Sequence, residues 1–231
     1  MSTSAAHKVF FGHVELGDAR ERTPTIDFIP AVAEPRAGTD AARKHAGPRS
    51  LNAHWEISAP VVFSKTDAET GYAFWERVRT FPTDLATAAT SGAGGVATWL
   101  AFVPDPLGSF TGTRNSTALT TGVSSGADQD ATDDDVSSWT VGDKLLVIDD
   151  ASPSTASEIV TTTSVGGGGF GATFANAHDA GSLVYRLEFY FGEAWLASPV
   201  SIPSTGHHSK ANATLELQFY AVQDLISGGL G

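Results

Sequence analysis

The chain has 231 residues, 41% of them hydrophobic, and a formal net charge of −12, and this length can bury a core in one domain or in a domain with an insertion. It contains no cysteine, which excludes disulfides and thiolate metal sites, and its acidity argues against a surface that wraps a phosphate backbone. No apolar run approaches the roughly 20 residues that cross a membrane, and the N-terminus lacks the apolar core of a signal peptide, so we expect neither membrane insertion nor Sec export.

The acidic balance of the chain has two interpretations. Lysine is scarce and aspartate outnumbers glutamate, which suggests a source that is rich in salt or in GC base pairs. Ordinary solubility through net charge explains the same balance. The 24 glycines and the many Thr, Ser and Ala residues favour β structure joined by loops.

Residues 1–50 are expected to form an arm rather than part of the core. Residues 8–14 predict one short strand, and the stretch after them is interrupted by Pro24, Pro30, Pro35 and Gly47. A long arm with few apolar anchors orders against a neighbouring subunit, or it forms a flexible terminus.

A strand followed directly by a helix is predicted for residues 51–81. Ala53, Trp55 and Ile57 face one side of the strand, an alternation typical of half-buried strands. The other side carries Asn52, His54, Glu56 and Ser58. Thr66 or Asp67 is expected to cap the helix, with Glu69 near the capping-box position, and Pro82 to end it. Its apolar side chains recur at three- and four-residue spacing, at Ala68, Tyr72, Trp75 and Val78.

Residues 114–182 are expected to form a small β module inserted into a host domain of residues 1–113 and 183–231. Before the module, residues 83–95 are expected to be a loop, and residues 96–103 predict a strand or a helix. Residues 116–135 have the composition of a low-complexity linker. Strands are predicted for residues 139–148, 156–165 and 170–174, with a glycine turn at 166–169.

The last two predicted strands complete the host domain. Residues 183–191 predict one strand, and residues 214–222 alternate most clearly, with Glu216, Gln218 and Tyr220 on the polar side. The predicted fold is therefore mainly β with one long α-helix, an α+β protein. The expected helix–sheet core comprises Trp55, Ile57, Tyr72, Trp75, Val78, Leu215, Leu217 and Phe219.

No constellation of residues in the sequence supports catalysis. Gly122–Gly126 matches G-x-S-x-G but lacks the flanking strand and helix that a nucleophile elbow needs. The aspartates of residues 128–135 fail the EF-hand spacing, and His207-His208 has no third ligand at metal spacing. His178 is interpreted as a turn residue. We therefore expect no enzyme activity, no metal and no cofactor.

The order of these parts resembles that of tail tube proteins of long-tailed viruses that infect bacteria or haloarchaea. The shared parts are a proline-rich arm, a strand–loop–helix unit, an inserted β module and a final alternating strand, and the resemblance covers about residues 1–113 and 183–226. The module itself resembles small β modules of phage structural proteins, in which Gly-Asp and Ala-Gly serve turns. The residues that carry this second likeness are Trp139, Gly142-Asp143, Glu158–Val160 and Ala177–Ser182.

The tail-tube resemblance implies a structural virion protein with a β-sandwich or barrel, assembled in the host cytoplasm and located in the virion tail. Such subunits form rings, expected to be hexameric, whose inner strands join into one barrel, and stacked rings conduct DNA during ejection. The implied partners are other copies, other tail and neck proteins, and passing DNA. The lumen-facing candidates are Asn52, His54, Glu56, Ser58, Glu216 and Gln218.

The resemblance also implies that the N-terminal arm and residues 83–95 and 198–210 make ring-to-ring contacts, and that the module decorates the outside. Two alternatives stay open. One is a tail terminator or head–tail connector that forms a single ring. The other is a capsid-decorating or receptor-binding protein in which the module is the working part.

Overall fold

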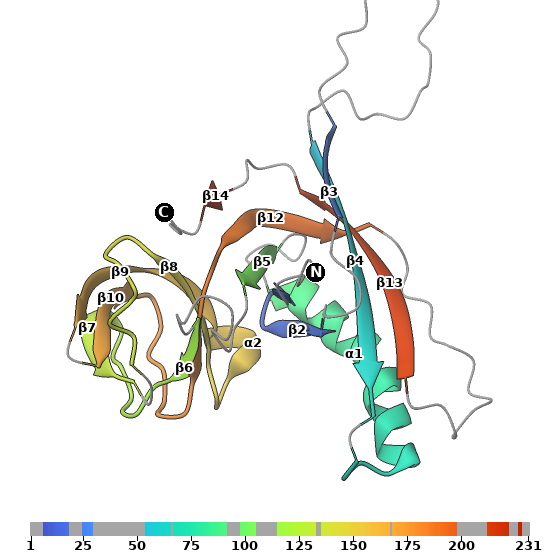
Figure 1. Ribbon diagram of the computed structural model, residues 1–231, viewed down its shortest axis with the longest axis horizontal. Helices are drawn as coiled ribbons and strands as arrows, with labels where there is room; N and C mark the ends of the chain where they lie inside the picture. Colours follow the sequence, from blue (N-terminus) through green and yellow to red (C-terminus); the bar gives the residue numbers. More distant parts are fainter. Residues whose placement is uncertain are drawn as a thin grey trace, which may run out of the picture.

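The computed structural model of the chain describes residues 7–18, 25–29, 54–65, 67–91, 98–104, 115–132, 135–166, 168–197, 212–221 and 226–227. Over these residues the structure is mainly β, with two antiparallel sheets and one long helix (Figure 1). This confirms the predicted mainly β fold with a long α-helix. Of the helices described, none is long and apolar enough to cross a membrane.

The first sheet has eight strands in the order β2-β1-β5-β12-β13-β4-β3, with β14 paired to β12. Its strands are β1 (His7–Phe11), β2 (Val14–Asp18), β3 (Thr25–Ile29), β4 (His54–Ser64), β5 (Thr98–Pro104), β12 (Phe189–Leu196), β13 (Asn212–Ala221) and β14 (Ile226–Ser227). The sheet bends strongly, as the contact between Phe11 on β1 and Phe219 on β13 shows. Their rings are tilted to each other with centroids 5.0 Å apart, although β5 and β12 separate the two strands in the sheet order.

Helix α1 (Gly71–Ser91) covers the inner face of this sheet, running beside β4 and β13 (Figure 1). Side chains spaced three or four residues apart form its buried stripe: Phe74, Val78, Phe81, Leu85 and Ala88. They share one core with Ile57, Leu215, Leu217 and Phe219, and Trp55 and Trp75 pack at its margin. Burying each large side chain of this kind contributes about 1.5–3 kcal/mol.

The start of α1 differs from the prediction. Thr70 Oγ1 accepts a hydrogen bond from the Ala73 N–H at 3.1 Å, so Thr70 is the N-cap and the predicted caps at Thr66 or Asp67 are wrong. Glu69 lies before the first residue of α1, outside the third helical position that a capping box uses, and its side chain pairs with Arg77 at 3.0 Å.

The predicted end of the helix at Pro82 is also wrong. Proline lacks an N–H group and costs about 3 kcal/mol in a helix interior. The helix nevertheless continues to Ser91, because its apolar spacing continues and buries Leu85 and Ala88 completely. Residues 83–91, expected to be a loop, are therefore helical.

Tyr72 does not belong to the core. Its side chain is 72% exposed, whereas Phe74 is 0% exposed and takes the core position. The prediction included Ala68 in the apolar stripe, but Ala68 lies in the turn before α1. Because Ala68 lies outside the helix, it does not define the apolar stripe, and the buried face of α1 contains Phe74 instead of Tyr72.

The expected N-terminal arm is wrong for residues 7–18. β1 and β2 form an antiparallel hairpin, and β1 also pairs with β5 along its whole length. Val9, Phe11 and Leu16 are buried in the core beside α1. Residues 25–29 also lie in the sheet, as the strand β3 next to β4, so the segments of the arm that the structure describes are integral to the fold.

The second sheet has six strands in the order β6-β11-β8-β9-β10-β7. Its strands are β6 (Ser116–Ala118), β7 (Gly126–Ala131), β8 (Lys144–Ile148), β9 (Glu158–Gly166), β10 (Gly169–Phe174) and β11 (Leu183–Arg186), with the short helix α2 (Pro153–Ala156) before β9. Leu119 and Thr132, which directly follow β6 and β7, form an antiparallel bridge. This bridge joins the two end strands and closes the sheet around a core that includes Trp139, Leu145, Phe170 and Phe174.

Two boundaries in this region differ from the prediction. Residues 116–135 contain β6 and β7 and are not a linker, because backbone pairing with β11 and β10 orders a Ser/Thr/Asp-rich segment that buries few large side chains. The strand predicted for residues 183–191 is two strands. β11 pairs with β6 and β8 in the second sheet, whereas β12 pairs with β5 and β13 in the first.

The two sheets meet at a small apolar joint. Phe10, Ala101 and Val103 on the outer face of β1 and β5 pack against Leu146, Tyr185 and Leu187. The rings of Phe10 and Tyr185 are 4.8 Å apart, and α2 lies against α1. The second sheet therefore covers the β1–β5 side of the first sheet and leaves the outer side of β3, β4 and β13 open.

Candidate functional site

The open outer side of β3, β4 and β13 is mainly polar, with Ile29 beside His54 and Pro60 beside Glu216 in the same rows. Along β13, Glu216, Gln218 and Tyr220 are exposed while the residues between them are buried. We define the polar face by Thr25, Asp27, His54, Glu56, Ser58, Glu216, Gln218 and Tyr220, which share this side of the sheet through their strand registers. The alternation follows from the period of two in each strand, since apolar side chains must face α1.

Cross-strand pairing sets these residues in rows. Glu56 lies opposite Asp27 on one side and Tyr220 on the other, and Ser58 lies opposite Thr25 and Gln218 in the same way. A shallow groove of about 230 Å³ runs across both rows. The groove is therefore lined by carboxylate, hydroxyl and amide groups from three strands.

The electrostatics of the polar face are acidic. Asp27 and Glu56 are both exposed and directly opposite each other, a like-charge arrangement that destabilises a sheet slightly. His54 Nε2 lies 3.4 Å from Glu56 Oε1, and β3, β4 and β13 contain neither lysine nor arginine. These strands thus present no fixed cation to an approaching polyanion.

The structure brings together five of the six lumen-facing candidates. His54, Glu56 and Ser58 lie on β4, and Glu216 and Gln218 lie beside them on β13. Asn52 lies outside the described residues. The sequence analysis missed the contribution of Asp27 and Thr25, because their short strand was assigned to the arm. The alternation of Ile26 and Phe28 with Thr25 and Asp27 was the available signal.

The motifs considered for catalysis or metal binding have other roles where the structure describes them. In Gly122–Gly126, the Ser124 N–H donates to Asp128 Oδ2 at 2.7 Å, and strand β7 rather than a helix follows. Within the ranges described, no group of three His, Asp or Glu side chains is placed to hold a metal ion. The glycine turn at 166–169 connects β9 to β10 as predicted, and His207-His208 lies outside the described residues.

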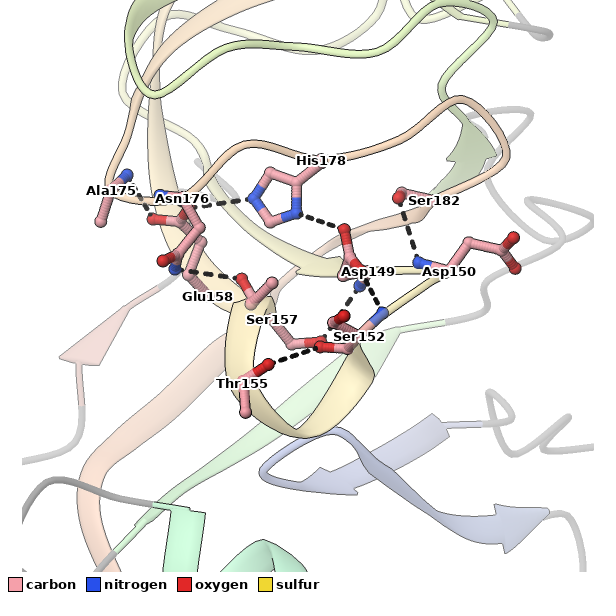
Figure 2. Close-up of polar contacts among 11 residues, drawn as sticks. Asp149, Asp150, Ser152, Thr155, Ser157, Glu158, Ala175, Asn176, His178 and Ser182 are labelled. Carbon is pink, nitrogen blue, oxygen red and sulfur yellow. Dashed lines mark hydrogen bonds and ion pairs between the residues drawn. The ribbon is translucent and has the colours of Figure 1, made fainter.

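A buried polar cluster in the second sheet was not anticipated from the sequence (Figure 2). The His178 ring is completely buried, with Nδ1 3.3 Å from Asp149 Oδ2 and Nε2 2.9 Å from Glu158 Oε1. Glu158 also accepts the backbone N–H groups of Ala175 and Asn176, each at 2.8 Å. His178 is therefore more than a turn residue: it ties the ends of β8 and β9 to the loop after β10.

This His178 cluster suits a structural role better than a catalytic one. Both ring nitrogens already face carboxylates, and the ring has no exposed surface. A general base needs a free nitrogen within reach of a substrate proton, and this arrangement offers none. The sequence did contain a signal for this cluster, because Glu158 and His178 both belong to the residues by which the module resembles small β modules of phage structural proteins.

Gly142 and Asp143, which belong to the same set of residues, also have structural roles. Asp143 and Arg186 form a buried ion pair in which Oδ2 and Nε approach to 2.7 Å. Asp143 additionally accepts hydrogen bonds from the Thr140 N–H and hydroxyl group, at 2.8 and 2.9 Å. Gly142 has a φ of +100°, a conformation that favours glycine at this turn.

Comparison of the chain with protein-family models and with curated proteins gives no match.

Proposed function

We propose that this chain is a structural virion protein whose copies form the stacked rings of a viral tail tube, with the polar face lining the channel that conducts DNA. The observation that carries the proposal is the polar face itself: an acidic surface on three adjacent strands that contain no lysine or arginine. Duplex DNA binds proteins chiefly through cations that neutralise its phosphates. A channel wall without cations lets the duplex slide.

The sheet order supports assembly into rings. Across the strands that are described, β3 lies at one end of the first sheet and β2 at the other. A strand at a sheet end presents backbone donors and acceptors to another chain. Head-to-tail contacts between two different surfaces of one subunit form a ring when the rotation between successive copies closes, and an open filament when it does not. In the proposed ring, each copy extends the sheet of the next.

The position of the second sheet supports the same arrangement. Its apolar joint occupies the β1–β5 side of the first sheet, away from the groove on β3, β4 and β13. The module packs on the same face of the sheet as the polar face but over β1 and β5, so it leaves the polar face clear, and in this proposal it lies at the outer margin of the ring. In this proposal the chain has a structural and not an enzymatic role, in the virion tail.

Negative-stain microscopy of the purified protein tests the proposal directly. Long tubes with a regular repeat are the expected result. Single rings that never stack would favour a tail terminator or connector, and discrete particles would favour a capsid-decorating or receptor-binding protein. Either of the last two results overturns the tube assignment.

A further inference from the structure

The first sheet consists of two halves that few elements connect. β3, β4 and β13 form the polar half, which carries the polar face, and β1, β2 and β5 form the module half, to which the second sheet is attached through the apolar joint. Among the described strands, backbone pairing connects the two halves only through β12, which lies between β5 and β13. β2 also lies beside β4, but these two strands are not paired.

Helix α1 packs on the polar half before Pro82 and on the module half after it. Before the proline, the Phe81 ring contacts the Phe63 ring of β4, with centroids 4.9 Å apart. After the proline, Ala88 lies against the tip of the β1–β2 hairpin, so closely that a Cβ atom placed on Gly12 would lie 3.2 Å from the Ala88 Cβ atom. Pro82 therefore stands where the helix passes from one half of the sheet to the other.

The hydrogen-bond ladder of α1 is interrupted at this position. Pro82 has no N–H group to donate to the Val78 carbonyl one turn earlier, and its ring crowds that carbonyl. Just before the proline, Thr80 Oγ1 donates to the carbonyls of Glu76 and Arg77, at 3.0 and 3.2 Å. Hydroxyl bonds of this kind bend helices, and sharp kinks occur at prolines. Pro82 is therefore the point at which α1 bends most easily.

Strand β12 is irregular at the same crossing. Phe189–Phe191 pair with β5, Ala194 pairs with both β5 and β13, and the last two residues of the strand pair with β13. Between the two paired segments, β12 advances from Phe191 to Ala194 while β5 advances from Leu100 to Thr98, so β12 contains one extra residue. This is a β-bulge at residues 192–193, and a bulge bends its strand.

We propose that Pro82 and the bulge in β12 form a hinge that changes the angle between the polar half and the module half. Both elements that span the halves lose regular hydrogen bonding where they cross, and hinge motions use a few such positions. The part of α1 after Pro82 and the second sheet move with the module half, while β2 slides along β4. Because the two halves share one core, the motion is a small rotation. The hinge belongs to the single chain and does not depend on the tube assignment.

Distances between two spin labels on the full chain, measured by pulsed electron paramagnetic resonance, test the hinge. The chain contains no cysteine, so labels attach only where cysteines are introduced. Ala73→Cys with Val141→Cys connects the first part of α1 to the second sheet, across the hinge. Ala86→Cys with Val141→Cys connects the second part of α1 to the second sheet without crossing it and is the matched control. All three positions are exposed, and dilution with unlabelled protein keeps each measured distance within one chain.

We expect a broader distance distribution for the pair that crosses the hinge than for the control pair. Pro82→Ala combined with Gly192→Ala should narrow it to the width of the control pair, because the first restores an N–H in α1 and the second restricts the backbone of the bulge. Pro153→Ala, which removes a proline from α2, should change neither pair. Equal widths of the two pairs without these substitutions, or a broad distribution that persists in the double variant, overturns the proposal. The first comparison does not depend on the double variant folding.

Discussion

Replacing Glu216 with arginine tests whether the polar face lines a DNA channel. Glu216 is exposed, and its neighbours Leu215 and Leu217 point into the core. The substitution therefore changes charge without disturbing packing, and surface changes of this kind alter stability by about 0.5 kcal/mol or less. We expect tubes to assemble normally and DNA release to slow or stop, because arginines in the channel bind phosphate.

The size of the effect follows from the salt dependence of phosphate contacts. Each contact adds about 0.9 to the slope of log affinity against log salt. One contact makes DNA retention about 3.5-fold stronger at 50 mM than at 200 mM salt, and six contacts from one ring of six copies make it about 10³-fold stronger. Stacked rings multiply the contacts further, so a small effect in each subunit becomes large along a tube.

The assay measures retention of duplex DNA in assembled tubes at the two salt concentrations, together with DNA release from virions. Asp67→Arg makes the same change of charge at an exposed position before α1 and is the matched control, expected to leave both readouts unchanged. Normal release and salt-independent behaviour of Glu216→Arg tubes, with the arginine located in the channel, refutes the electrostatic argument.

Three further predictions concern the fold. Leu85→Ala should lower the free energy of unfolding in urea by about 2–5 kcal/mol, since Leu85 is fully buried. Tyr72→Ala should change it by about 0.5 kcal/mol or less, and equal effects of the two substitutions contradict the observed helix face. Pro82→Ala should raise the thermal midpoint, because it restores an N–H inside α1 and removes a residue that costs about 3 kcal/mol there; a lower midpoint shows that the ring is needed for packing. Burial, with a smaller contribution from Glu15, raises the pKa of Tyr185 to about 12, so the stability that this residue contributes is present below pH about 10 and is lost as the pH rises to about 12. In a titration followed by phenolate absorbance, the signal that Tyr185→Phe lacks should therefore appear near pH 12. Its appearance near pH 10 contradicts the buried position.

The sequence alone was sufficient wherever a pattern was local and strongly periodic. The alternation of residues 214–222 predicted β13 and the exposure of Glu216 and Gln218, because side chains in a strand point to opposite faces at successive positions. The same reasoning predicted the strand that contains Trp55 and Ile57. The mainly β class and the long helix followed from these patterns without knowledge of any contact between distant residues.

Only the tertiary structure decided where local rules competed with packing. The rule that proline ends a helix failed at Pro82, since the buried side chains beyond it stabilise the helix by more than proline costs. The hairpin at residues 7–18 looked like an arm because its partner strand β5 lies about 90 residues away along the chain. His178 was interpreted as a turn residue for the same reason. Its structural role depends on contacts with Asp149 and Glu158, which only the folded second sheet brings to its two ring nitrogens. Burial and pairing between distant segments are properties of the folded chain, and no local pattern of residues specifies them.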